Sequence, residues 1–465
     1  MSKAASTATV TAPSMGSERY AGTSVALGVD PMVAGTQLLA DLGGPYVLYE
    51  RHGQVCVGSG AVAELLLNRH EVRWRVRDEW RVVPVGDDPM QQVAELLADC
   101  GVADWRAYGW FAFELSYLLH GMPEAAGEAT LAHLIVPMRE ARLAGDTAEL
   151  RAVEISELAE LCARVRLLRS PDREAATRTM ADEMIDYDSY RRTVLAAVDD
   201  IQAHRLQKVI LSRVVPVSAA IDLAATYRTG RRGNTPARSF LLDLGGLRAT
   251  GFSPETVVEV DASGRVSTQP LAGTRALSGD SGRDDALRTE LLNDPKEVFE
   301  HAVSVRGAQQ ELREICRDGS VRVDEFMTVS RRGSVQHLAS RVSGQLAGGR
   351  NGWHALTALF PAVTASGLPK PAACAAIHRY ESQPRDLYGG AVVVVDADGS
   401  LDAALVLRTV FQRDGRTWLR AGAGVVEQST PEREFEETRE KLRSISRFLV
   451  PATEQVSIED VVIAP

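Results

Sequence analysis

Lysine is scarce in this chain: five lysines occur in 465 residues, against 47 arginines. Four of the five lie beyond residue 205, at Lys208, Lys296, Lys370 and Lys441. Arginine stays protonated in any protein setting, whereas a buried lysine can lose its proton and act as a base. Lys208 is the clearest candidate because it lies within the apolar run 206–212. The alternative is compositional drift in a chain rich in Arg, Ala and Gly, and lysine counts alone favour that alternative.

Cysteine and long apolar runs are scarce too, and each absence excludes a class of protein. The five cysteines show neither zinc-ligand spacing nor a disulfide framework, so we expect a reduced, cytoplasmic protein. No run approaches the roughly 18 apolar residues of a membrane span. The N-terminus has no basic segment followed by an apolar core, so no signal peptide is expected. A net charge of −10 argues against nucleic acid or an anionic membrane as a partner.

The pattern of apolar residues changes along the chain. Short strand-like runs mix with helical stretches before residue 185, whereas long strand-like runs, such as 389–396 and 402–413, dominate beyond residue 205. Strands that follow one another through short turns pair antiparallel. We therefore divide the chain into a flexible N-terminal tail (1–30), an N-terminal subdomain (31–185), a larger second region (186–450) and a C-terminal tail (451–465).

Two predicted helices carry pairs of carboxylates. Glu297 and Glu300 lie near the start of the first helix, and Glu434 and Glu437 near the start of the second. A spacing of three residues places both carboxylates of a pair on one helix face, about 5–6 Å apart. Two such pairs facing each other would supply oxygen ligands for a hard cation such as Mg²⁺. The alternative is a solvated charged face, which the dense opposite charges of 432–441 favour for the second helix alone.

Three shorter segments have the chemistry of a binding site. Glu255 directly follows the turn 251–254, where burial would make its carboxyl a general acid. The small residues of 270–275 and 421–424 let backbone N–H groups approach an anion. Neither has the glycine spacing of a P-loop or of a dinucleotide fingerprint. Each segment is weak evidence by itself, since turn residues are the ordinary explanation.

Together and in this order, the segments resemble the chorismate-utilising enzymes, the family of anthranilate, aminodeoxychorismate, isochorismate and salicylate synthases. The resemblance covers about 190–450 and rests on ten separated motifs: 208–213, 251–255, 270–275, 294–301, 334–337, 360–367, 387–390, 405–409, 421–424 and 432–441. It implies a single large α/β (α+β) unit, in which layered antiparallel β-sheets with surrounding helices enclose the site. It also implies a Mg²⁺-dependent reaction on chorismate, with 186–450 as the catalytic region.

The resemblance assigns catalytic roles to three residues. Lys208 matches the base that activates water for attack at ring C2 of chorismate. Glu255 matches the acid that protonates the departing C4 hydroxyl, which gives isochorismate. His337 matches a histidine that lines the active site near the pyruvyl side of the substrate.

The resemblance also implies the ligands of metal and substrate. Glu300 and Glu437 match the magnesium carboxylates, with Glu297 and Glu434 beside them, acting through water. Arg408 would grip the enolpyruvyl carboxylate with both arms of its guanidinium group. The substrate contacts that the resemblance implies are Gly273, Thr274, Thr364, Tyr388, Arg408, Gly422, Ala423, Gly424 and Lys441.

The residues at two positions distinguish between the branches of the family. Ammonia-using members usually lack a lysine at position 208, and aminodeoxychorismate synthases carry a lysine where this chain has Ala272. We therefore expect water as the nucleophile, and the segments 332–337 and 360–367 favour the salicylate synthases of mycobactin-type siderophore pathways. Isochorismate synthase without lyase activity is the alternative; an anthranilate synthase component or a non-catalytic homologue is disfavoured. We expect a monomer without a glutaminase partner.

Overall fold

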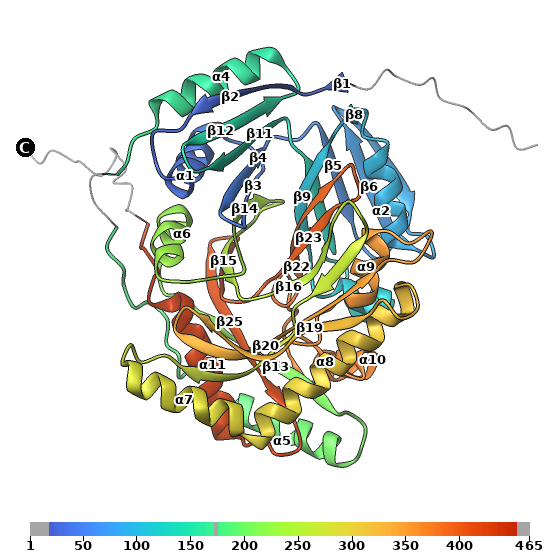
Figure 1. Ribbon diagram of the computed structural model, residues 1–465, viewed down its shortest axis with the longest axis vertical. Helices are drawn as coiled ribbons and strands as arrows, with labels where there is room; N and C mark the ends of the chain where they lie inside the picture. Colours follow the sequence, from blue (N-terminus) through green and yellow to red (C-terminus); the bar gives the residue numbers. More distant parts are fainter. Residues whose placement is uncertain (1–17, 172–174, 453–465) are drawn as a thin grey trace, which may run out of the picture.

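Two large antiparallel sheets face each other in the computed structural model, which describes residues 18–171 and 175–452 (Figure 1). Apolar side chains of both sheets fill the space between them, among them Tyr49 and Phe240 of one sheet and Tyr108 and Val392 of the other. Because strand side chains alternate between the two faces, the same strands also bury apolar residues against the outer helices. The predicted α/β unit of layered antiparallel sheets with surrounding helices is confirmed.

The first sheet has twelve strands within the described residues. In spatial order they are β18 (Leu271–Ala276), β20 (Val335–Gln345), β17 (Arg265–Thr268), β16 (Thr256–Val260), β23 (Leu401–Leu405), β22 (Ala391–Asp396), β9 (Arg106–Phe111), β10 (Ala132–Val136), β5 (Ala63–Leu67), β6 (Glu71–Val76) and β7 (Glu79–Pro84), with β19 (Arg322–Arg332) beside β20.

The second sheet has eleven strands in the same described part of the chain. Their spatial order is β2 (Ala21–Ala26), β12 (Thr147–Ala152), β11 (Arg139–Ala144), β4 (Gln54–Ser59), β3 (Tyr46–Arg51), β14 (Arg238–Leu244), β15 (Leu247–Ser253), β24 (Thr409–Arg413), β25 (Arg416–Val425), β13 (Lys208–Pro216) and β21 (Gly367–Leu368). A separate short parallel pair joins β1 (Glu18–Arg19) to β8 (Val102–Ala103).

Helices surround the two sheets (Figure 1). They are α1 (Pro31–Leu42), α2 (Pro89–Ala98), α3 (Leu115–Leu119), α4 (Ile155–Leu167), α5 (Tyr187–Gln202), α6 (Leu223–Arg232), α7 (Ser281–Asn293), α8 (Pro295–Ile315), α9 (Gly352–Leu359), α10 (Lys370–Tyr380) and α11 (Pro431–Ser446), with a 3₁₀ turn at Pro123–Ala126. In Figure 1, α5, α7, α8 and α11 gather at the lower end of the molecule, next to β13, β20 and β25.

The sheets mix strands from both sides of residue 185. In the first sheet β9 pairs with β22, and in the second β3 pairs with β14. The expected boundary at 185 stays a prediction, because the two regions share both sheets rather than one sheet each. The expected N-terminal tail is corrected in part: β1 and β2 lie within 1–30, and β2 pairs with the edge strand β12. Residues 1–17 and 453–465 of the expected tails lie outside the described residues.

The expected continuous strand 402–413 is also corrected. The chain leaves the first sheet after β23, passes Arg408 with a positive φ of 52°, and enters the second sheet as β24. A second crossing runs from β15 through Pro254 and Glu255 into β16. The crossings bond to each other, since the Phe252 N–H donates to Arg408 O at 3.2 Å and the Leu405 N–H to Glu255 O at 3.2 Å. Strand periodicity continues through such a crossing, so the sequence does not reveal it.

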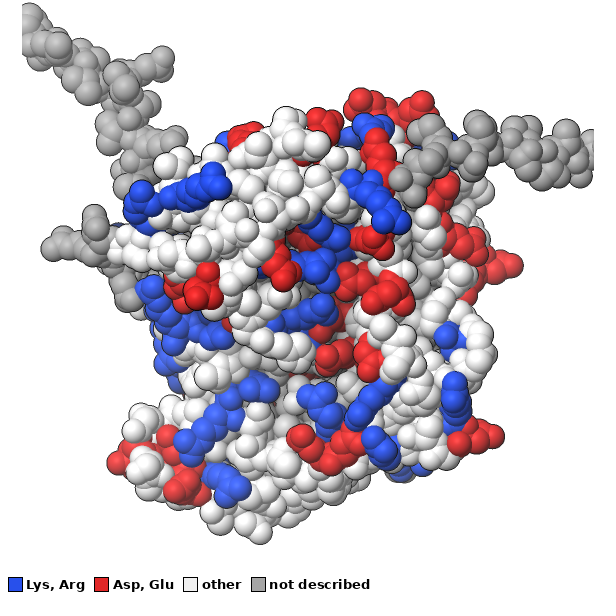
Figure 2. Space-filling view, turned by 45° about the horizontal axis from the view of Figure 1, so that its top comes forward, with Lys and Arg blue, Asp and Glu red and all other residues white. Residues whose placement is uncertain are grey.

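Basic and acidic side chains alternate over the face of the molecule in Figure 2, and neither sign dominates that face. Within the described residues, no helix has both the length and the apolar character that a membrane crossing requires.

A substitution at Gly109, in the middle of β9, tests how closely β9 and its neighbouring strand must approach each other. A Cβ atom at this position would lie 2.1 Å from the carbonyl oxygen of His133 on β10. We expect Gly109→Ala to lower the free energy of unfolding by about 3 kcal/mol, because the neighbouring backbone has to move. Urea denaturation measures this change. Gly22→Ala on β2 is the matched control, since its Cβ would meet nothing closer than 3.5 Å; an equal loss in both variants would contradict the prediction.

Candidate active site

A cavity of about 60 Å³, here called the main cavity, lies between α8, α11 and the adjoining edges of the two sheets. It brings together residues that are far apart in the sequence, from Lys208 to Ile445. Most of the predicted site residues line it: Lys208, Gly273, Thr274, Glu300, His337, Thr364, Tyr388, Arg408, Gly422, Gly424, Glu437 and Lys441. Four predicted residues, Glu255, Glu297, Ala423 and Glu434, lie next to the cavity without lining it.

The first carboxylate pair is held at the start of α8. The Asp294 side chain accepts hydrogen bonds from the backbone N–H groups of Lys296 and Glu297, and proline follows at the first helical position. Glu297 and Glu300 then point inward and are 1% and 5% exposed, whereas Phe299 between them is exposed. Because both carboxylates are buried, the alternative that this face of α8 is a solvated charged surface is excluded.

The second carboxylate pair lies near the start of α11. Glu434 and Glu437 are 0% and 4% exposed, so the solvated-face alternative is excluded here as well. Phe435, Leu442 and Ile445 of the same helix are buried as well. Pro431 begins the helix, and the Thr430 side chain makes no capping hydrogen bond.

Each of the four carboxylates has a cationic partner. Lys208 Nζ lies 3.0 Å from Glu300 Oε1, Lys296 Nζ 2.8 Å from Glu434 Oε1, and Lys441 Nζ 2.8 Å from Glu437 Oε1. Arg275 Nη1 lies 3.1 Å from Glu297 Oε1. Three of the five lysines of the chain are therefore partners of the predicted metal carboxylates. The i, i+4 spacing of Glu437 and Lys441 belongs to the charge pattern of 432–441. The pairings of Lys208 and Lys296 join different elements, so sequence spacing does not reveal them.

The buried carboxylates lie close together and differ in pKa. Burial raises the pKa of Glu297 to about 7, and nearby Glu437 adds to that effect. The pKa of Glu434 is also raised to about 7, mainly by burial. Lys441 and Lys296 act in the opposite direction on Glu437 and hold its pKa well below the usual range. The site thus favours additional positive charge at neutral pH.

This arrangement fits a divalent cation. Glu297 Oε2 is buried and has no hydrogen-bond partner, and buried charged oxygens normally have one. Carboxylate oxygens are the ligands that Mg²⁺ prefers, usually one or two of them together with water and substrate oxygens. Glu300 and Glu437 line the main cavity, so a cation held by them would also be within reach of a bound anion.

Another acidic group of the described residues, formed by His52, Glu259 and Asp402, has converging ligand atoms but does not fit a metal ion. The Arg238 guanidinium donates to Asp402 Oδ2 at 2.6 Å and lies 3.4 Å from Glu259 Oε2. Arg51 adds a second cation 3.8 Å from Asp402. The carboxylates are therefore already neutralised, and this group links the two sheets.

Lys208 lies on β13, which pairs with β21 on one side and with β25 on the other. It is 1% exposed, and besides Glu300 its ammonium group donates a hydrogen bond to Ser304 Oγ at 3.0 Å. Alternation along β13 directs Lys208 and Ile210 into the main cavity. The apolar run that singled out Lys208 in the sequence continues into β13, which lies between β25 and the short edge strand β21.

Glu255 lies beside the main cavity, at the crossing from β15 to β16. Its Oε2 accepts a hydrogen bond from the Leu271 N–H at 2.8 Å, while Oε1 is buried without a partner. Burial raises the pKa of Glu255 to about 8. At neutral pH this carboxyl therefore carries a proton, which is the state that a general acid needs.

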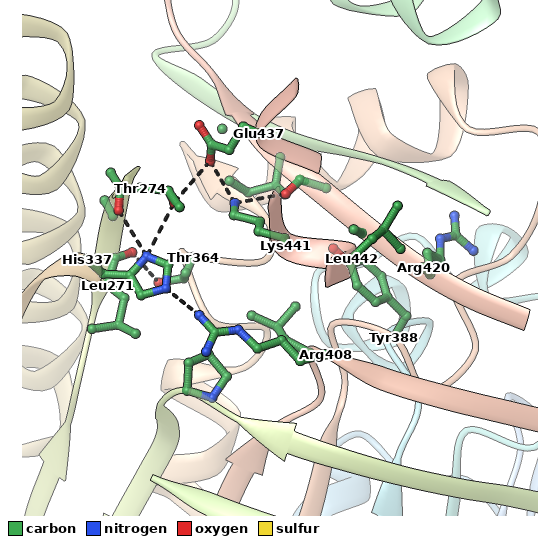
Figure 3. A pocket seen from close by; sticks show the side chains of 18 of the residues that line it. Leu271, Thr274, His337, Thr364, Tyr388, Arg408, Arg420, Glu437, Lys441 and Leu442 are labelled. Carbon is green, nitrogen blue, oxygen red and sulfur yellow. Dashed lines mark hydrogen bonds and ion pairs between the residues drawn. The ribbon is translucent and has the colours of Figure 1, made fainter. Parts of the chain in front are cut away.

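Arg408 and His337 form the opposite part of the cavity wall (Figure 3). The His337 Nδ1–H donates to Gly273 O at 3.0 Å, so its Nε2 is free to accept a hydrogen bond from Arg408. Burial and the charge of Arg408 hold the pKa of His337 well below its usual range, which keeps the ring neutral. Burial lowers the pKa of Arg408 to about 9, so the guanidinium stays charged at neutral pH. Its left-handed backbone is the kind of local strain that occurs at functional sites.

Two positions of β25 require glycine because neighbouring atoms lie close to the backbone. A Cβ at Gly424 would lie 2.2 Å from Glu300 Oε1, and a Cβ at Gly422 would lie 2.7 Å from Leu211 O. Gly273 has a positive φ of 71°. Ala423, between the two cavity-lining glycines of β25, points to the other face of the strand, so only its backbone stays a predicted contact.

Sequence reasoning missed the arginines that support Tyr388. Arg420 lines the main cavity, and Arg385 and Arg420 lie 5.8 Å and 5.6 Å from the centre of the Tyr388 ring. Glu381 binds both arginines, at 2.6 Å and 2.5 Å. Arginine is common in this chain, so composition does not reveal which arginines are buried.

The family profile described as chorismate binding enzyme matches residues 46–447. The chain is 43% identical over 439 residues to the salicylate synthase of Mycolicibacterium paratuberculosis, which covers 91% of this chain and 94% of that protein. The chain belongs to the chorismate binding enzyme family.

Anthranilate and isochorismate synthases are similar to the chain at lower sequence identity. Anthranilate synthase component 1 of Mycolicibacterium smegmatis is 37% identical over 61% of this chain and 53% of that protein. Two solved structures share the fold: anthranilate synthase component I of Streptococcus pneumoniae, with a TM-score of 0.71, 24% identity and coverage of 88% and 94% of the two chains, and the menaquinone-specific isochorismate synthase of Escherichia coli, with a TM-score of 0.69, 21% identity and coverage of 93% and 96%.

The protonated state of Glu255 predicts how stability depends on pH. Its pKa is about 8 in the folded protein, against an ordinary value of 4.5. Between these values the folded protein holds a proton that the unfolded chain releases, so this residue lowers the free energy of unfolding as the pH rises. Glu255→Gln removes that contribution, and the variant gains stability relative to the wild type by up to about 1.4 kcal/mol per pH unit. Urea denaturation across this pH range measures the difference; a constant difference would contradict a proton on Glu255.

Proposed function

We propose that the protein is a Mg²⁺-dependent salicylate synthase, which converts chorismate to isochorismate and then to salicylate and pyruvate. The observation that carries the proposal is the combination of a buried lysine, Lys208, with a buried carboxyl that holds its proton, Glu255. The reaction needs a base for water and an acid for the leaving hydroxyl, and these two groups supply both. The 43% identity to a salicylate synthase along most of the chain supports the same branch.

The first step exchanges one hydroxyl group for another. Lys208, as the neutral amine, takes a proton from water, and the resulting hydroxide forms a bond to ring C2. The ring double bonds shift, the C4–O bond breaks, and Glu255 protonates the departing hydroxyl, so that water leaves. Lys208 Nζ lies 3.0 Å from Glu300 Oε1, so the step requires that this pairing weaken when substrate is bound.

Substrate charge is met by groups on opposite sides of the main cavity. Arg408, hydrogen-bonded to the neutral His337, and Tyr388 would hold the enolpyruvyl carboxylate. Glu300 and Glu437 would hold Mg²⁺, with Glu297 and Glu434 beside them through water. A bound Mg²⁺ supplies positive charge that polarises and orients the ring carboxylate. Gly273, Thr274, Thr364, Lys441 and the backbone of Gly422–Gly424 complete the substrate contacts.

The second step removes pyruvate from bound isochorismate. We propose a pericyclic transfer of the hydrogen at C2 to the enolpyruvyl methylene carbon while the C3–O bond breaks. This step needs the side chain held over the ring and calls for no additional acid or base. The walls of the main cavity, which α8, α11 and both sheets supply, would provide that constraint.

Isochorismate synthase without lyase activity is the second candidate, because it requires the same base and acid. An anthranilate synthase component is disfavoured by Lys208, and an aminodeoxychorismate synthase by Ala272, which lines the main cavity. A non-catalytic homologue would be expected to lose the base, the acid or the carboxylates, and all of them are buried together here. We further propose a cytoplasmic monomer without a glutaminase partner, whose product enters siderophore biosynthesis.

The products formed from chorismate decide between these functions. With Mg²⁺ and chorismate, we expect salicylate and pyruvate in equal amounts, separated by chromatography and quantified. Isochorismate that accumulates without pyruvate would contradict the lyase half of the proposal. Anthranilate formed when ammonium replaces water as the nucleophile would contradict the choice of branch.

Lys208→Ala separates the two steps. We expect it to slow isochorismate formation from chorismate by about 10²–10⁴-fold, since the base is lost, while supplied isochorismate still loses pyruvate. Lys208→Arg is the matched control: it keeps a positive charge beside Glu300 but cannot act as a base at neutral pH, so the first step stays slow. Restored activity with arginine, or equal loss of both steps in Lys208→Ala, would contradict a role in water activation.

A further inference from the structure

A second, smaller cavity borders Glu255, and Thr364 lines both this cavity and the main cavity. Its volume is about 10 Å³, roughly the space that one water molecule needs. Polar groups from several elements line it, among them Glu255, Gln269, Ser304, Glu311 and Thr364. A site of this size with several polar neighbours suits an ordered water. We call it the rear cavity.

The rear cavity continues the inner face of α8 beyond the metal carboxylates. Ser304, Ala308 and Glu311 follow Glu300 at helical spacing and all three line the cavity. Ala308 is the only one of the three without a polar side chain. The rear cavity thus borders two carboxyl groups, Glu311 of this helix and Glu255 of the crossing from β15 to β16.

Glu311 is the more accessible of these two carboxyl groups. Its side chain is 17% exposed, and Lys370 Nζ lies 2.8 Å from its Oε1. Lys370 also donates to Ala358 O at 3.3 Å, which fixes the ammonium group over the carboxylate. Glu255 is 1% exposed, and its Oε1 has no hydrogen-bond partner. One group therefore reaches solvent and the other does not.

We propose that Glu311 and a water in the rear cavity return a proton to Glu255 after each turnover. This rests on the proposed function, in which Glu255 gives its proton to the departing C4 hydroxyl. The Glu255 carboxylate then takes a proton from the cavity water, this water takes one from Glu311, and Glu311 takes one from solvent. The proton that Lys208 removed from the attacking water balances the cycle when it is released. Glu311 is a positioning and relay residue, and Lys370 holds it in place.

The first turnover separates this role from a structural one. The resting enzyme already holds a proton on Glu255, so Glu311→Gln should complete one turnover at the wild-type rate and then slow down. We expect a burst of about one equivalent of isochorismate plus salicylate, followed by a steady rate about tenfold or more below that of the wild type. Rapid quenching of the full-length enzyme with Mg²⁺ and chorismate measures both phases. Pyruvate loss from supplied isochorismate, which uses no acid, should stay within about twofold.

Glu314→Gln is the matched control on the exposed side of the same helix, and it should show no burst. A second pair of variants tests the path without touching Glu311. Ala308→Val fills the rear cavity and should reproduce the burst. Ala308→Thr has almost the same size but brings a hydroxyl that can pass a proton, so its steady rate should exceed that of the valine variant.

Each outcome decides between explanations. A wild-type enzyme that does not convert chorismate contradicts the proposed function itself. If the wild type is active but Glu311→Gln has an unchanged steady rate, or a slowed first turnover, the relay is wrong while the function stands. A burst in Ser304→Ala but not in Glu311→Gln would show that the proton returns internally from Lys208, which donates to Ser304, and would overturn the route through Glu311.

Discussion

The burial of four carboxylates at the start of two neighbouring helices is the constraint on which this structure depends. Glu297, Glu300, Glu434 and Glu437 together carry more negative charge than a protein interior tolerates without compensation. Lys208, Lys296, Lys441 and Arg275 supply that compensation from four separate elements. Helix caps, the glycines of β25 and the position of β13 all serve to bring these charges to one place.

The second constraint is that the chain crosses between the two sheets beside the site. Glu255 and Arg408 occupy these two crossings, and hydrogen bonds join the crossings directly. A residue at a crossing is held by both sheets, so neither sheet can slide without displacing the acid or the arginine. This explains how groups far apart in the sequence keep a fixed geometry.

The sequence alone predicted the parts that depend on local patterns. The one-face spacing of each carboxylate pair and the apolar run around Lys208 are visible in the sequence, and the structure places them on α8, α11 and β13. Motif order predicted the family. It did not predict the break at Arg408, because apolar periodicity continues through it, nor the pairing of Lys208 and Lys296 with carboxylates of other elements. Likewise the burial of Glu255 beside the rear cavity is decided by long-range packing.

The few lysines of the chain have a practical consequence. All four lysines of the described residues are paired with glutamates, and the most accessible of their side chains, that of Lys441, is 26% exposed. Reagents that acylate amines would therefore meet little reactive lysine on the folded surface. Amine coupling should therefore leave the four lysines of the described residues, and the site that three of them help to form, largely unmodified.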